Sequence, residues 1–192
     1  MLGPSPRARL HDVYTLTARI KAIARLARQD MLDGHRGPQL RALAGAIVKH
    51  CPVRGDVGQP RADLCELQSV FEWIVDHVRY SGDIGPMRLT DSGPREAVDL
   101  YQSPFRTIQM GVSDCDDMAP LVMVLLRYLG WDVILRVSSS DGKAWSHIWA
   151  LALCPKVPVL RVPQRWVPMD TTLGHGKIGV APTSVKHLDF KV

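Results

Sequence analysis

The chain has 192 residues, of which 46% are apolar, and a formal net charge of +5. This is enough chain for one compact domain with a sizeable core. No stretch approaches the roughly 20 uninterrupted apolar residues of a membrane span, and residues 1–5 show no apolar signal-peptide region, so we expect a cytoplasmic or otherwise soluble protein.

The first fifty residues are basic, with nine Lys and Arg against three Asp. Apolar residues fall on one helical face from 13 to about 30, which predicts an amphipathic helix. Asp33-Gly34 and Gly37-Pro38 are expected to end it, and a second helix is predicted over 39–49. The basic face is a candidate docking surface for a protein partner. Nucleic-acid binding is not favoured, because a charged helix face is usually only solvated.

A third helix is predicted over 64–79, where apolar residues recur at spacings of three and four. Asp63 followed by Glu66 resembles a capping box at its start. The polar, Gly- and Pro-bearing segment 81–95 is expected to be a surface loop, and 96–110 a short helix with a connecting segment.

The segment from 115 to 129 is apolar on nearly all sides, which predicts a buried helix ending at Gly130. Strands are predicted over 133–137, 145–153 and 165–170, the first two as an antiparallel hairpin. Pro155, Pro158 and Pro163 exclude a central strand between the last two. Helices followed by a small antiparallel sheet indicate the α+β class.

The four cysteines, Cys51, Cys65, Cys115 and Cys154, show no C-x-x-C spacing. Neither a structural zinc site nor a disulfide framework is indicated, so we expect reduced thiols. The histidines form no metal spacing either. The sequence therefore predicts no metal and no cofactor.

Cys115 stands at the predicted start of the buried helix, where the helix dipole and unpaired amides favour a thiolate. The neighbouring aspartates oppose that effect, so we expect an imidazolium to hold the thiolate. His147 is the candidate, and Asp170 on the next strand is the candidate carboxylate that orients its ring. This arrangement requires the strand face that bears His147 to pack on the cysteine helix.

Weaker candidates lie near these three residues. Backbone amides at the helix start are expected to form an oxyanion hole, with Gln109 as a weak candidate for an added donor. Asp114 is expected to serve mainly as a helix-start charge, with selection of a cationic substrate group as the alternative. Trp149 and Trp166 are candidates for shaping a substrate cleft, although aromatic residues on adjacent strands more often belong to a core.

Four motifs resemble, in order, those of the transglutaminase-like superfamily of papain-related cysteine enzymes. They are Asp114-Cys115-Asp116-Asp117, Leu129-Gly130-Trp131, His147-Ile148-Trp149 and the segment from Trp166 to Thr172. The resemblance covers roughly residues 63–175. It implies a papain-like α+β core in which Cys115 is the nucleophile, His147 the general acid/base and Asp170 its orienting group.

Cys115 is followed by Asp116, where the animal cross-linking enzymes have Trp, and the chain is too short for their calcium-binding inserts. A calcium-dependent cross-linker is therefore not expected. Prokaryotic and phage members of this size resemble peptidases or amidases more closely, and this is an analogy.

These observations predict an N-terminal helical extension over 1–62 and a catalytic domain over 63–192. The expected reaction is acyl transfer through a thioester, most simply hydrolysis of an amide or peptide substrate. The alternative is a catalytically silent module in a larger assembly, such as a phage particle, docked through the basic N-terminal helices. The expected location is then the cytoplasm, or a virion if a phage encodes the chain.

Overall fold

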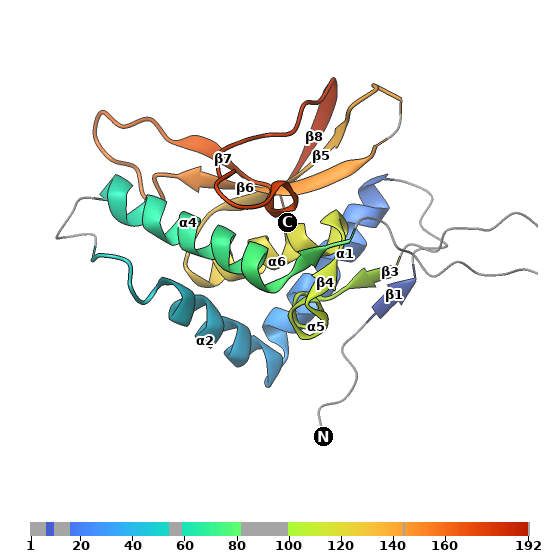
Figure 1. Ribbon diagram of the computed structural model, residues 1–192, viewed down its shortest axis with the longest axis horizontal. Coiled ribbons are helices and arrows are strands. Elements are labelled where there is room, and N and C mark those ends of the chain that lie inside the picture. Colours follow the sequence, from blue (N-terminus) through green and yellow to red (C-terminus); the bar gives the residue numbers. More distant parts are fainter. Residues whose placement is uncertain (1–6, 10–15, 54–58, 82–99, 144, 192) are drawn as a thin grey trace, which may run out of the picture.

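The computed structural model describes residues 7–9, 16–53, 59–81, 100–143 and 145–191. Helices occupy one side of the molecule and a small sheet the other, with α6 between the sheet and the N-terminal helices (Figure 1). The elements are β1 (Arg7–Arg9), α1 (Leu16–Leu32), α2 (Arg36–Val48), α4 (Gln59–His77), β2 (Arg79–Tyr80), β3 (Leu100–Gln102), α5 (Pro104–Met110), β4 (Val112–Ser113), α6 (Cys115–Tyr128), β5 (Val133–Ser139), β6 (His147–Cys154), β7 (Arg165–Met169), the 3₁₀ turn η1 (Thr171–Leu173) and β8 (Lys186–Lys191).

The sheet is antiparallel, with strand order β7-β6-β5-β8. Val133 pairs with Ala152 and Ser138 with His147 in the β5–β6 hairpin, while Ala150 pairs with Met169 between β6 and β7. Two further strand pairs, β1 with β3 and β2 with β4, lie outside this sheet. The mixed helix and sheet composition confirms the predicted α+β class.

Helix α6 is central because almost every side chain on it is apolar. From Met118 to Leu126 every residue is buried, and the same core cluster takes in Ile148, Ala150 and Ala152 of β6. The two alanines are small, so they allow the helix to lie close to the strand. The burial predicted for this helix is confirmed.

Helices α1 and α2 belong to the same core cluster, through residues such as Ile23 and Leu40. The start of α2 lies close to the end of α1 at Gly37, where an added Cβ would lie 2.5 Å from the carbonyl oxygen of Met31. The two helices predicted in the first fifty residues are therefore confirmed, and both pack on the core around α6. The boundary placed at residue 62 stays a prediction.

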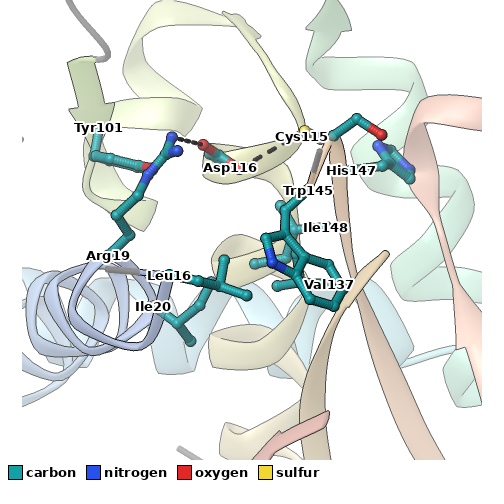
Figure 2. A pocket seen from close by; sticks show the side chains of 11 residues that line it. Leu16, Arg19, Ile20, Tyr101, Cys115, Asp116, Val137, Trp145, His147 and Ile148 are labelled. Carbon is teal, nitrogen blue, oxygen red and sulfur yellow. Dashed lines mark hydrogen bonds and ion pairs between the residues drawn. The ribbon is translucent and has the colours of Figure 1, made fainter. Parts of the chain in front are cut away.

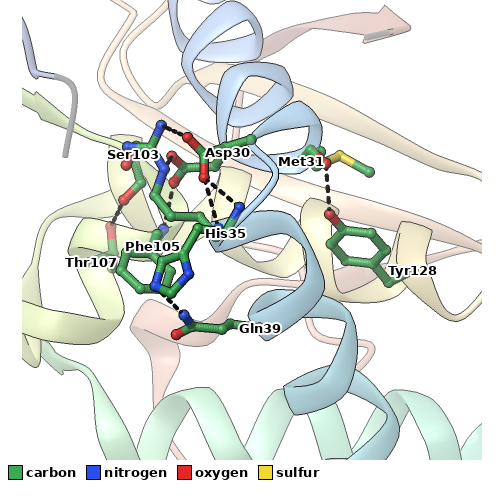
Figure 3. Close-up of polar contacts among 10 residues, drawn as sticks. Asp30, Met31, His35, Gln39, Ser103, Phe105, Thr107 and Tyr128 are labelled. Carbon is green, nitrogen blue, oxygen red and sulfur yellow. Dashed lines mark hydrogen bonds and ion pairs between the residues drawn. The ribbon is translucent and has the colours of Figure 1, made fainter. Parts of the chain in front are cut away.

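A buried carboxylate fixes the C-terminal end of α1 (Figure 3). Asp30 is fully buried, accepts a hydrogen bond from the backbone N–H of Phe105 at 2.8 Å, and lies 3.3 Å from Nε of Arg36. That ion pair lacks hydrogen-bond alignment, since neither Asp30 Oδ1 nor Arg36 Nε has a hydrogen-bond partner. Tyr128 of α6 donates to the carbonyl of Met31 at 3.1 Å. Together these contacts tie α1 to α5 and α6.

Two local predictions are wrong, and one strand was not predicted. Asp63 is not a helix cap, because α4 already begins at Gln59; Asp63 is buried and accepts from the backbone N–H of Lys156 instead. Gly37 and Pro38 lie inside the first turn of α2, where proline needs no intrahelical partner. Strand β8 was not predicted, since it is a short and largely exposed edge strand. The loop expected over 81–95 falls almost entirely outside the described residues.

The expectation of four reduced thiols is also wrong, because Cys51 and Cys65 form a disulfide. Packing of α2 beside α4 brings the two residues together, and a separation of 14 residues gives no sign of it in the sequence. Disulfides persist mainly in oxidising compartments. The cytoplasmic location stays a prediction, and this pairing counts against it.

Within the described ranges, none of the helices has the length and apolar character needed to cross a bilayer.

Candidate active site

Cys115 is the first residue of α6, and the residue before it explains why the helix starts there. Asp114 has extended backbone geometry, and its carboxylate accepts hydrogen bonds from the backbone N–H groups of Asp116 at 3.1 Å and Asp117 at 3.3 Å. This is N-capping by an acidic side chain. Asp114 thus has the role at the helix start that was expected for it, and its carboxylate is hydrogen-bonded to the first turn of α6.

A cavity of about 340 Å³ opens beside Cys115 (Figure 2). Elements far apart in the sequence form its walls: α1, β3, the start of α6, β5 and the start of β6. The residues that line it are Leu16, Arg19, Ile20, Tyr101, Cys115, Asp116, Val137, Trp145, Ser146, His147 and Ile148. Cys115 and His147, which are 32 residues apart in the sequence, therefore border one cavity.

His147 and Asp170 are hydrogen-bonded, with 2.7 Å between Nε2 and Oδ2. His147 is the first residue of β6, and Asp170 directly follows β7, the adjacent antiparallel strand. The side chain of Asp170 is 1% exposed, and its other oxygen accepts from both the backbone N–H and the hydroxyl of Thr172. The carboxylate is thus held in place, and it fixes the orientation of the imidazole.

Trp149 packs against this imidazole from the same strand face, with the ring centroids 5.4 Å apart. It does not line the cavity. It is buried with Ile134 and Leu151 in a small cluster, whereas the alternate residues of β6 face the core around α6. The packing of the His147 and Trp149 face on the cysteine helix, expected as a condition of the arrangement, is not found along the strand, because the smaller side chains occupy that side. His147 nevertheless borders the same cavity as Cys115, since it lies at the first position of β6.

The remaining candidates lie away from the cavity. Trp166 is 38% exposed and lines a second cavity, of about 550 Å³, together with Trp131 and Lys191. Gln109 is an exposed residue near the end of α5 and is not among the cavity-lining residues. The structure thus places Cys115 and His147 at one cavity, with Asp170 hydrogen-bonded to His147. Gln109, Trp149 and Trp166 do not line that cavity.

A family model described as the transglutaminase-like superfamily matches residues 53–171. The chain belongs to this superfamily. The matched segment contains the cysteine, histidine and aspartate above. It does not contain α1 or β8, which lie outside it on either side.

Two solved structures are also similar to the chain. One, a candidate cysteine protease from Cytophaga hutchinsonii, is 19% identical with a TM-score of 0.38, and the match covers 73% of this chain and 43% of that one. The other, Legionella pneumophila LapG treated with EGTA, is 16% identical with a TM-score of 0.41, covering 86% and 74%. The chain thus spans less than half the length of the first. No curated protein matches it significantly.

The thiol of this superfamily member lies in a polar network. Its Sγ donates to Oδ1 of Asp116 at 3.8 Å, and Oδ2 of Asp116 lies 3.8 Å from a guanidinium nitrogen of Arg19. The Arg19 guanidinium also donates to the hydroxyl of Tyr101, at 3.1 and 3.3 Å. Burial, and then the charge of Asp116, raise the pKa of Tyr101, so this hydroxyl stays protonated.

Asp117 has a different role from Asp116. It is buried and accepts from the backbone N–H of Gln102 at 2.6 Å and from the Gln102 side-chain amide at 2.9 Å. Burial, and then the charge of Asp114, raise the pKa of Asp117 to about 8. This carboxyl group joins β3 to the start of α6 and carries little charge near neutral pH.

Sequence reasoning missed the residues that α1 and β3 bring to the cavity: Leu16, Arg19, Ile20 and Tyr101. Arg19 was visible only as one of several basic residues on an amphipathic helix. No spacing links it to Cys115, because the contact depends on how α1 packs against α6. Trp145, just before β6, is partly buried and also lines the cavity.

Proposed function

We propose that this protein is a cysteine-nucleophile acyl-transfer enzyme that hydrolyses an amide or peptide bond through a thioester. Cys115 is the nucleophile, His147 the general acid/base and Asp170 the group that orients the imidazole. The single observation that carries the proposal is the 2.7 Å hydrogen bond between His147 and a buried Asp170, at a cavity that Cys115 also borders.

The nitrogen assignments follow from that contact. Because Nε2 of His147 is bonded to Asp170, Nδ1 is the nitrogen that exchanges protons with the thiol and the substrate. In the first step the thiolate attacks the carbonyl carbon, and the imidazolium gives its proton to the departing amine as the C–N bond breaks. In the second step the imidazole takes a proton from water, which attacks the thioester and releases the acid and the thiolate.

The start of α6 supports the charge changes in both steps. A helix N-terminus favours the thiolate and offers backbone N–H groups to the oxyanion. The amides of Asp116 and Asp117 already bind the carboxylate of Asp114. The oxyanion donor we propose is therefore the backbone N–H of Cys115 itself.

The cavity walls suggest which substrates fit. Part of its wall is apolar, from Leu16, Ile20, Val137 and Ile148, and Trp145 adds an aromatic ring. Arg19 and Asp116 supply a polar edge (Figure 2). We propose a peptide whose residue beside the scissile carbonyl places an apolar side chain against the apolar part of this wall, since apolar lining binds such groups.

Thiol reactivity tests the proposal, with Cys154 as an internal control. Burial, and then the charge of Asp63, raise the pKa of the Cys154 thiol, so it reacts slowly near neutral pH. Without reductant, iodoacetamide at pH 7 is expected to modify Cys115 at least about tenfold faster than Cys154. The variant His147→Ala removes this difference. Equal rates in the unmodified protein contradict the proposal and favour a catalytically silent binding module.

Acyl transfer is tested separately with p-nitrophenyl acetate. We expect a burst of nitrophenol equal to the enzyme concentration, since the acetyl group is transferred to Cys115 before water releases it. The burst disappears in Cys115→Ser and is unchanged in Cys154→Ser. A reactive Cys115 without a burst contradicts the acyl-transfer step.

A further inference from the structure

Helix α1 precedes the matched segment, yet it provides one side of the cavity. Leu16 and Ile20 give this side its apolar surface, and Arg19 gives it a charge (Figure 2). The Arg19 side chain is 36% exposed, and two of its nitrogens donate to the buried hydroxyl of Tyr101. The guanidinium is therefore held in a defined place.

Asp116 connects this guanidinium with the thiol. One oxygen of its carboxylate lies 3.8 Å from Arg19, and the other accepts from Sγ of Cys115 at 3.8 Å. The contact with the thiol is favourable only while sulfur keeps its proton. Once the thiolate forms, two negative groups face each other at that distance, and such repulsion raises a thiol pKa.

We infer that Arg19 is a positioning residue for the nucleophile, acting through Asp116. It neutralises the carboxylate and draws it toward α1, so that Asp116 opposes thiolate formation less. This inference rests on the proposed function and assigns part of the catalytic unit to the N-terminal helical segment. That segment thus contributes a charge to the reacting centre as well as a surface.

The other titratable groups around the thiol cannot replace Arg19. Asp114 is hydrogen-bonded to the backbone of its own helix, and Asp117 is hydrogen-bonded to Gln102. Both are carboxyl groups in fixed positions, so neither can supply a positive charge. Tyr101 faces the pair from β3 as a protonated hydroxyl. His147, on β6, borders the same cavity as the thiol and is itself held by Asp170.

A purely structural role predicts a different result from this electrostatic one. If Arg19 only supports α1, its loss lowers stability and reactivity at every pH without moving the pH midpoint. If it acts on Asp116, its loss moves the midpoint, and the movement depends on the Asp116 charge. Because Asp30 anchors the other end of α1, we expect the helix to stay in place without Arg19.

The test measures the rate of iodoacetamide modification of Cys115 between pH 5 and 10 in the full chain. We expect Arg19→Met to raise the midpoint by about 0.5 to 1 pH unit, which slows the reaction about three- to tenfold below the midpoint. Arg19→Lys keeps the charge and restores most of the rate. Arg25→Met, on the exposed face of the same helix, serves as the matched control and leaves the midpoint unchanged.

The double variant decides the mechanism. Asp116→Asn is expected to lower the midpoint, and in that background Arg19→Met shifts it no further. An unchanged midpoint in Arg19→Met, or an equal shift with Asn at 116, overturns the inference. Either result leaves the proposed function intact as long as Cys115 still reacts faster than Cys154 and depends on His147. If Cys115 does not react faster than Cys154, or if its reactivity does not depend on His147, the proposed function itself is contradicted.

Discussion

Nε2 of His147 and Oδ2 of Asp170 lie 2.7 Å apart, and the carboxylate is almost completely buried. Asp170 caps η1 through Thr172, so the position of its second oxygen is fixed by backbone structure. The contact joins the start of β6 to the end of β7. The pairing of these two strands therefore fixes the orientation of the His147 imidazole.

Asp170→Asn tests this relationship. The amide keeps the size of the side chain but cannot stabilise an imidazolium, so we expect nitrophenyl ester turnover to fall by about a hundredfold or more. Thr172→Val removes one of the bonds to the other oxygen and should reduce turnover far less. Equal losses in the two variants would show that Asp170 acts only by capping η1.

Leu16→Trp tests the apolar wall of the cavity. Leu16 is the partly buried first residue of α1, so a larger ring there is expected to narrow the cavity without disrupting the core. Modification of Cys115 by iodoacetamide should stay within about twofold of the unmodified protein, whereas a peptide chloromethyl ketone with a phenylalanine side chain should react about tenfold more slowly. Lys21→Trp, exposed on the same helix, is the control. If both reagents slow equally, the cavity is not the substrate site.

The disulfide predicts a thiol count and a stability difference. In denaturant without reductant, two thiols should react with Ellman's reagent, and after reduction four should react. Replacing Cys51 and Cys65 together by serine is expected to lower the free energy of unfolding by about 3 kcal/mol, because it opens a loop of 14 residues. Cys154→Ser should change it much less. Four reactive thiols in the unreduced protein would show that the pair is not oxidised.

Asp117 predicts an unusual dependence of stability on pH. Its pKa is raised from 3.8 to about 8, so the folded chain keeps a proton that the unfolded chain has already lost in this range. The contribution of Asp117 to stability is therefore fully present below about pH 4 and decreases as pH rises to about 8. Asp117→Asn, in which Gln102 can turn its amide to match, should flatten this part of the profile in urea unfolding.

Asp189→Asn provides the opposite control. The hydrogen bonds from Arg136 lower the pKa of Asp189, so its contribution is present above its ordinary pKa and is lost only as pH falls. Its replacement should leave the slope between pH 5 and 8 unchanged. If Asp117→Asn leaves that slope unchanged too, Asp117 is ionised in the folded protein near neutral pH.

Much of the fold could be predicted from local sequence patterns. The apolar run after Cys115 predicts a buried helix because the segment from 115 to 129 is longer than a typical buried strand and is apolar on nearly all sides. The β-branched residues before Ser138 predict a strand for a similarly local reason. The motifs around Cys115, His147 and Asp170 identified residues that lie near one another in the structure. Each motif also marks the start or end of the helix or strand that positions its residue.

Features that depend on packing were not accessible from the sequence. Strand alternation places His147 and Trp149 on one face, but it does not say which face meets α6; in the structure the face with Ile148 and Ala150 does. The pairing of Cys51 with Cys65 requires α2 and α4 to be neighbours. Arg19 reaches the site for the same reason, through contacts between distant segments rather than a motif.

The disulfide also has a topological consequence. Cys51 precedes the matched segment, which begins at residue 53, and Cys65 lies within it. A protease that cuts anywhere between these two residues leaves both fragments linked through sulfur. The fragment that carries α1 then stays tethered to the fragment that carries Cys115, and only a reductant allows the two to separate.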